Sequence, residues 1–316
     1  MQNKILSMVV FVIFSAIGCF WIYSQNYKDN AISSSNNPAT TRVSSVQPYD
    51  NLIYETKRND TKKLEHPGDL SDILRRGKLV VCALKNDQNA VYQVKTSNGY
   101  AGEDVRVASE LGKVLGVKVL YRMVYETNDD VVDAVNRGEG DLGLADLSYT
   151  DERAKKVLFT EPYVVLQKVL LVNRVALTKK PGASLERLLD RKDVNIAVMK
   201  GTSYERFAKK LFPKAKIHAE TDWMEGAVKK LEEGKVVSIF RSSLRMGKLL
   251  ADRPQISMHF VPLVLKGEKD IISAVTNINS PAFVLFINNF LKNNYEILTV
   301  EELQKLYQKL YEEQKI

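Results

Sequence analysis

An arginine in a short polar loop, Arg153, has the chemistry and the setting to hold a carboxylate. It follows the apolar segment 142–145 within the sequence DLSYTDERAKK. Ligands of open α/β sheets bind beyond the carboxyl ends of the strands, and a guanidinium there can bind a carboxylate through two parallel N–H···O bonds. Asp146 and Ser148 share this loop and offer an acceptor and a hydroxyl. The alternative interpretation is an ordinary helix residue, with Thr150 as the helix N-cap.

A second polar pair, Thr202 and Ser203, precedes an amphipathic segment that begins near Tyr204. Hydroxyls and free backbone N–H groups at the start of a helix favour an anion. Ser203 fits the role of an ordinary N-cap equally well. If the chain forms two lobes that close on each other, both polar groups meet at one small carboxylate.

Buried strands and amphipathic helices must position these groups. Residues 78–84 are continuously apolar, as in the strands of parallel sheets, and two expected helices end at Gly116 and Gly138. Strands and helices alternate up to residue 145, which predicts a parallel sheet covered by helices, and a second set follows from Val164. We expect helices at 70–76, 103–115, 129–137, 185–189, 204–211, 222–233, 282–291 and 300–311, and strands at 78–84, 117–124, 142–145, 164–172, 194–199, 217–219, 236–240, 260–265 and 271–276.

Three separated, collinear blocks carry a resemblance to a known family. The first runs from Gly138 to Tyr163 and includes Asp141, Ser148, Thr150, Arg153, Phe159, Thr160 and Pro162. The others are GYAGEDV at 99–105 with LGVKV at 115–119, and GTS at 201–203. These blocks resemble signature motifs of the bacterial extracellular solute-binding proteins, family 3.

The resemblance implies an α/β, two-lobed fold like that of the type II periplasmic-binding proteins. Each lobe is expected to be a mainly parallel sheet with flanking helices, joined to the other by a two-crossing hinge. Residues 68–163 and 256–316 would form lobe 1, and 164–255 would form lobe 2. The implied function is capture of a small carboxylate-bearing, amino-acid-like ligand for an ABC transporter, with an inner-membrane permease as partner.

The sequence departs from the family where amino-acid binders carry an aspartate for the ligand ammonium. That position falls near Ser242 here, and its neighbour is Arg241. A cation there would repel an ammonium and attract a second anion. The expected ligand-binding residues are Arg153, Ser148, Asp146, Thr202, Ser203, Ser242 and Arg241.

Two other functions fit the resemblance. One is a membrane-tethered sensor or regulatory module, like the binding-protein-like domain of some membrane-bound lytic transglycosylases. The other is an enzyme, because some dehydratases resemble these proteins. The histidines His66, His218 and His259 lie outside the matched motifs, and no metal-ligand spacing occurs. We therefore expect no catalysis, no cofactor and no metal.

The N-terminal segment predicts the compartment. Residues 5–23 are apolar, close to the roughly 20 residues that cross a bilayer as a helix. We expect 1–24 to be an uncleaved signal anchor. A lipoprotein signal at Cys19 and a cleaved signal are the alternatives. The polar stretch 25–67 is expected to be a flexible linker, and the body to lie in the periplasm or at the cell surface, anchored to the inner membrane.

Charge and cysteine content argue against a nucleic-acid partner and against a nucleophilic cysteine. The 46 basic and 38 acidic residues give a net charge of +8, but they are interspersed without a basic block. We therefore expect no nucleic-acid partner. Cys82 lies in an apolar strand and is expected to be a buried small hydrophobe rather than a nucleophile.

Overall fold

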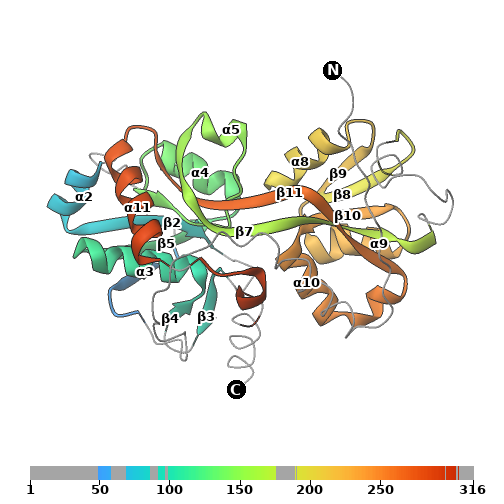
Figure 1. Ribbon diagram of the computed structural model, residues 1–316, viewed down its shortest axis with the longest axis horizontal. Coiled ribbons are helices and arrows are strands. Elements are labelled where there is room, and N and C mark those ends of the chain that lie inside the picture. The colour runs from blue at the N-terminus through green and yellow to red at the C-terminus, as the bar shows by residue number, and fades with distance from the viewer. Residues whose placement is uncertain are drawn as a thin grey trace.

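One sheet runs through two lobes of the molecule, which confirms the expected fold class (Figure 1). The computed structural model describes residues 49–57, 69–85, 92–96, 99–175, 189, 191–295, 297–303 and 305. The sheet has nine strands in the order β1-β5-β2-β6-β11-β7-β10-β8-β9, and β3 and β4 form a separate hairpin. The strands are β1 (Leu52–Glu55), β2 (Lys78–Leu84), β3 (Val94–Thr96), β4 (Gly99–Ala101), β5 (Lys118–Tyr125), β6 (Leu142–Gly143), β7 (Val157–Asn173), β8 (Asn195–Met199), β9 (Lys216–Glu220), β10 (Ser238–Ser242) and β11 (Phe260–Asn277).

Helices flank both halves of the sheet. The α-helices are α2 (Leu70–Arg76), α3 (Glu103–Leu115), α4 (Asn128–Asn136), α5 (Asp151–Ala154), α8 (Ser203–Leu211), α9 (Lys229–Glu232), α10 (Ser243–Asp252) and α11 (Pro281–Asn294). A π-helix, η2 (Trp223–Val228), precedes α9, and a 3-10 helix, η3 (Pro254–Met258), follows α10.

The first lobe is built on parallel strands whose two faces are both buried. β1, β5, β2 and β6 pair in parallel, and six of the seven residues of β2 are buried. Asp69 caps α2 and also accepts the backbone N–H of Phe283 at 2.7 Å. This hydrogen bond links the first turn of α11 to the start of α2, so two helices that are far apart in the sequence pack together in the first lobe.

The second lobe repeats the parallel arrangement with fewer strands. β10 pairs in parallel with β8, and β8 with β9. Separate apolar clusters cover the two faces of this part of the sheet. In one of them the ring of Phe240 meets the rings of Tyr204 and Phe212 edge to face.

Two long antiparallel strands, β7 and β11, connect the lobes. Their register runs from Phe260 opposite Asn173 to Asn277 opposite Val157, with an irregularity between Val264 and Lys269. These are the two crossings that the family resemblance implies. Phe260 and Leu265 pack in second-lobe clusters. We therefore propose that the chain returns to the first lobe after Leu265, within β11, rather than at 256.

Several elements differ from the sequence-based expectation. Leu52–Glu55 form edge strand β1 inside the stretch expected to be a linker. The expected strands at 260–265 and 271–276 are one strand, because antiparallel pairing with β7 continues past the polar residues between them. The expected helix at 222–233 begins as π-helix η2, and α10 was not anticipated.

The expected anchor and Cys19 lie outside the described residues, as do most of the linker and the expected helix at 185–189 apart from Leu189. Among the helices that the structure describes, none combines the length and the apolar character needed to span a membrane.

Candidate functional site

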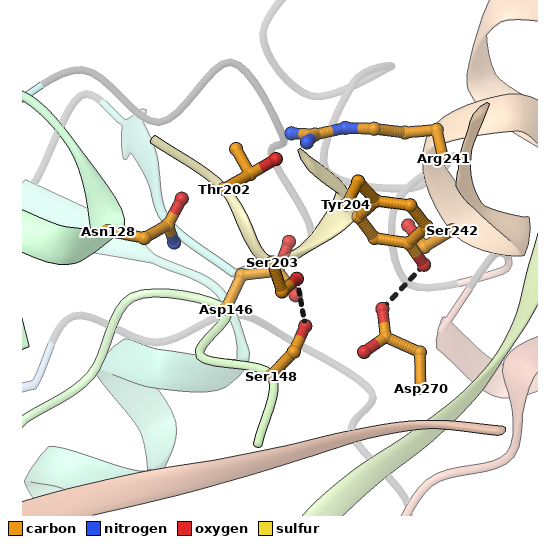
Figure 2. A pocket seen from close by; sticks show the side chains of 9 residues that line it. All are labelled: Asn128, Asp146, Ser148, Thr202, Ser203, Tyr204, Arg241, Ser242 and Asp270. Atoms are coloured by element: carbon orange, nitrogen blue, oxygen red, sulfur yellow. Dashed lines mark hydrogen bonds between the residues drawn. The ribbon is translucent and has the colours of Figure 1, made fainter. Parts of the chain in front are cut away.

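A small cavity lies between the lobes, beside the hinge strands (Figure 2). Its volume is about 10 Å³, roughly the space of one water molecule. A larger ligand therefore requires the lobes to separate. The cavity is lined by Asn128, Asp146 and Ser148 of the first lobe, by Thr202, Ser203, Tyr204, Arg241 and Ser242 of the second, and by Asp270 of β11.

Six of the seven residues expected to bind the ligand line this cavity. Asp146 and Ser148 lie on one wall, and Thr202, Ser203, Arg241 and Ser242 on the other. Thr202 is the N-cap of α8, and Ser242 caps α10 by accepting the backbone N–H of Arg245. Arg153, the expected carboxylate anchor, does not line the cavity, and its role in ligand binding stays a prediction.

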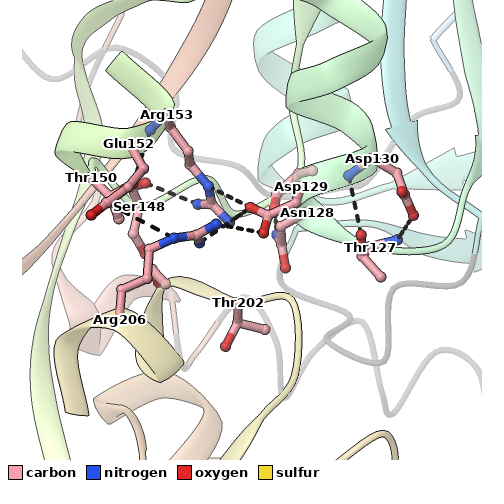
Figure 3. Close-up of polar contacts among 12 residues, drawn as sticks. Thr127, Asn128, Asp129, Asp130, Ser148, Thr150, Glu152, Arg153, Thr202 and Arg206 are labelled. Carbon is pink, nitrogen blue, oxygen red and sulfur yellow. Dashed lines mark hydrogen bonds and ion pairs between the residues drawn. The ribbon is translucent and has the colours of Figure 1, made fainter. Parts of the chain in front are cut away.

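The guanidinium of Arg153 is occupied by a carboxylate of the protein itself, that of Asp129 (Figure 3). Nε and Nη2 donate to Asp129 Oδ1 at 3.0 and 2.9 Å, and Nη1 donates to the Ser148 carbonyl at 3.0 Å. The Arg153 side chain is only 3% exposed. Asp129 thus holds the Arg153 guanidinium through one carboxylate oxygen, where a ligand carboxylate was expected to bind.

Asp129 also joins the two lobes. Arg206 of α8 donates from Nη2 to Asp129 Oδ2 at 2.7 Å, so one carboxylate of α4 binds guanidinium groups from both sides of the cleft. Burial by itself raises the pKa of Asp129, but Arg206 and Arg153 outweigh it and the pKa is lowered. Burial lowers the pKa of Arg153, a shift that Asp129 opposes.

Further polar contacts join the two walls of the cavity. The hydroxyl of Ser203 donates to that of Ser148 at 2.8 Å, and Arg245 Nη2 lies 3.4 Å from Asp146 Oδ2. The Tyr204 hydroxyl donates to Asp270 Oδ2 at 2.6 Å. The lobes are therefore held together by their own side chains.

The loop that carries Asp146 is positioned by the GYAGEDV segment. Asp146 has φ 50°, the only positive value at a non-glycine residue in the described part of the chain, and such strain is typical of functional sites. Asp104 of α3 accepts its backbone N–H at 3.3 Å and the Tyr163 hydroxyl at 2.6 Å. Any residue other than glycine at position 102, just before α3, would place its Cβ 2.3 Å from the Tyr92 carbonyl oxygen. This close approach therefore requires Gly102.

Arg241 contributes an unusual group to the cavity. Its side chain has no hydrogen bond or ion pair among the described residues, and its guanidinium lies 5.6 and 5.8 Å from the ring centres of Tyr204 and Trp223. Burial, and next the charge of Arg245, lower its pKa to about 10. It remains a cation at neutral pH.

Sequence reasoning missed Asn128, Tyr204 and Asp270 in the cavity wall, and Asp129 beside it. Asp270 is 1% exposed, and burial raises its pKa although Ser148 and Tyr204 lower it. The sequence signal for Asp270 is weak, because it is the last residue of the polar stretch KGEKD and directly precedes the apolar run IISAV. Within the described ranges, no group of three or more His, Cys, Asp or Glu side chains is arranged to hold a metal.

Comparisons with known proteins identify the family of the chain. The model of bacterial extracellular solute-binding proteins, family 3, matches residues 79–313. The chain is 27% identical over 166 residues to a probable histidine-binding protein of Campylobacter jejuni subsp. jejuni serotype O:2, covering 52% of this chain and 60% of that protein. It is 30% identical over 140 residues to membrane-bound lytic murein transglycosylase F of Maricaulis maris (strain MCS10), covering 44% and 28%.

Solved structures show the same fold. An ancestral cationic amino acid solute-binding protein matches with a TM-score of 0.51 and 27% identity, over 77% of this chain and 97% of that one. An amino acid ABC transporter substrate-binding protein from Streptococcus pneumoniae, bound to L-arginine, matches with a TM-score of 0.59 and 22% identity, over 77% and 98%. The chain spans less than two thirds of the length of the curated relatives it matches. With residues 79–313 covered by the family model, the chain belongs to the bacterial extracellular solute-binding proteins, family 3.

Proposed function

We propose that this protein captures a small carboxylate-bearing, amino-acid-like ligand between its two lobes and delivers it to an ABC permease. One observation carries the proposal: a single cavity is lined by polar residues of both lobes and by a hinge strand. Hinge closure around a ligand is how two-lobed binding proteins work. The ligand stabilises the closed form by its greater affinity for that form, and the permease would recognise the closed form.

The lining suits a small polar ligand. Five hydroxyls surround the cavity, from Ser148, Thr202, Ser203, Tyr204 and Ser242, together with charged groups of both signs. Relatives named as a histidine-binding protein and a cationic amino acid binder support an amino-acid-like ligand. We propose binding without turnover, because this fold and family are typical of non-enzymatic solute-binding proteins.

For location, the family is typically extracytoplasmic. We propose that the apolar run 5–23 anchors the protein in the inner membrane, with the folded lobes in the periplasm or at the cell surface.

A second candidate function is a membrane-tethered sensor that binds a solute without transporting it. The identity to lytic murein transglycosylase F favours this alternative. The same ligand capture would then act on a partner protein instead of a permease.

Calorimetric titration of the full chain in detergent, against the twenty L-amino acids and small dicarboxylates, tests ligand capture. We expect at least one compound to bind. Ser203→Tyr should abolish that binding because it fills the cavity, whereas Ser71→Tyr on an exposed face of α2 should not. Circular dichroism checks that both variants fold. If no compound binds the wild type, or if Ser203→Tyr folds and binds normally, the proposal is wrong.

Reconstitution separates transport from sensing. Proteoliposomes that hold the protein and an amino acid ABC permease of the same organism should take up the bound ligand if the first proposal is correct. Ligand binding without uptake would favour the sensor.

A further inference from the structure

The charged groups around the cavity divide into those that have charged partners and those that do not. Arg153 and Arg206 share the carboxylate of Asp129, and Arg245 faces Asp146. These groups neutralise one another within the protein. Binding a ligand charge through any of them would require a protein ion pair to break, which is costly for buried groups.

Arg241 is the exception among the described arginines. Each of the others donates a hydrogen bond to a carboxylate or to a backbone carbonyl. Among the described residues, the interactions found for the Arg241 guanidinium are with the aromatic rings of Tyr204 and Trp223. Such contacts engage the face of a guanidinium, whereas its N–H donors lie at the edge. Those donors are therefore the ones available to an anion in the cavity (Figure 2).

Asp270 supplies the opposite charge. Its Oδ2 accepts a hydrogen bond from Tyr204, a neutral donor. Its buried Oδ1 has no hydrogen-bond partner of good geometry in the described residues, although the Ser148 hydroxyl is near. The nearby ammonium of Lys168 lies 2.9 Å from Glu268 and is engaged there. No ion pair links Asp270 to Arg241 within the described structure, and Figure 2 shows the Tyr204 ring between the two side chains.

We infer that Arg241, not Arg153, binds the anionic group of the ligand, and that Asp270 accepts its ammonium or another donor. The ligand anion would then face the second lobe and the ligand cation the hinge, the reverse of the orientation that the Arg153 motif implies. This inference rests on the proposed ligand capture. It also accounts for the lack of an aspartate near Ser242 of β10. The acidic group for the ligand ammonium is then Asp270, which lies in the cavity on β11.

Calorimetry with chemically matched probes tests the orientation. The probes are the amino acid that binds best in the titration and the same compound without its amino group. Arg241→Gln should weaken binding of both probes about 100-fold, because a buried charge-assisted contact is lost. Arg241→Lys should restore part of the affinity. Asp270→Asn should weaken the amino acid about 10-fold or more and leave the affinity of the deaminated probe within about threefold.

Two further variants make the result specific. Arg253→Gln removes a partly exposed guanidinium of the second lobe and should leave both affinities unchanged. Arg153→Gln should weaken binding less than Arg241→Gln, because Arg153 affects the ligand only indirectly, through the Asp129 contact that holds the lobes closed. Near-normal binding by Arg241→Gln together with complete loss in Arg153→Gln would overturn the inference and leave ligand capture intact. Absence of binding to the wild type would overturn both proposals.

Discussion

At the scale of single residues, burial determines the chemistry of Cys82. The side chain is fully buried in β2, and its thiol donates a hydrogen bond to the Tyr125 hydroxyl at 3.5 Å. Desolvation disfavours the thiolate and raises the pKa of Cys82 to about 12. The reactive form of cysteine is the thiolate, so Cys82 should be inert in the folded protein.

Alkylation checks this directly. With iodoacetamide at pH 8, well below the raised pKa, the folded full chain should leave Cys82 unmodified, whereas an ordinary thiol of pKa about 8.5 would react. In guanidinium chloride the same peptide should be fully modified. Mass mapping distinguishes it from the peptide of Cys19. Rapid modification in the folded state would contradict the burial of this strand.

At the site, the sequence predicts local motifs but not the contacts between residues that are far apart in the chain. The motif pointed to the Arg153 loop, and the departure at Ser242 pointed to Arg241, because both are local patterns. The pairing of Arg153 with Asp129 joins residues 24 positions apart, and Arg206 comes from the other lobe. Such partners depend on how the lobes pack, which one sequence does not specify.

At the scale of elements, the cleft is closed by a contact between α4 and α8. Asp129 of α4 bridges Arg153 and Arg206 without any ligand, and the two hinge strands β7 and β11 let the lobes move as units. Closure by protein groups favours the closed form before ligand arrives. When a ligand enters, Asp129 must either keep its contacts with Arg153 and Arg206 or exchange them for others.

Asp129→Asn should shift the lobes toward an open arrangement. The change leaves the buried Arg153 guanidinium without a carboxylate, and losing one partner of such a pair costs about 3 kcal/mol. Small-angle X-ray scattering should show a larger radius of gyration, and thermal unfolding a lower midpoint.

The matched control lies on the same helix. Asp133→Asn removes an equal charge from an exposed pair with Lys156 and should change stability by less than about 1 kcal/mol. Identical scattering of Asp129→Asn and wild type would show that this contact does not hold the lobes.

The elements themselves were largely predictable. The limits of α2, β2 and α3 follow from their apolar patterns and, for the two helices, from the glycines Gly77 and Gly116 at their C-termini, and the structure agrees with them. β1 was missed because Leu52–Glu55 lie in a polar stretch and gain their strand from pairing with β5. The continuity of β11 was missed because polar residues interrupt its apolar pattern, whereas pairing with β7 resumes at Lys269 after the irregularity that follows Val264.

At the scale of the whole molecule, the central claim is that a ligand binds between the lobes and contacts both. A nine-stranded sheet with four apolar clusters gives each lobe a rigid body, so the cleft is where bound ligand should change the dynamics. Binding stabilises the bound state by about 2.7 kcal/mol at a ligand concentration 100 times Kd. Local opening of the cleft should become correspondingly rarer.

Hydrogen–deuterium exchange of the full chain, with and without an equimolar mixture of amino acids and dicarboxylates, tests this claim most directly. We predict that ligand slows exchange together in the segments around Ser148, Ser203 and Ser242, which belong to the two walls of the cavity. Segments far from the cleft, such as α2, should be unaffected. Unchanged exchange in all three segments, or protection confined to one lobe, would contradict capture between the lobes.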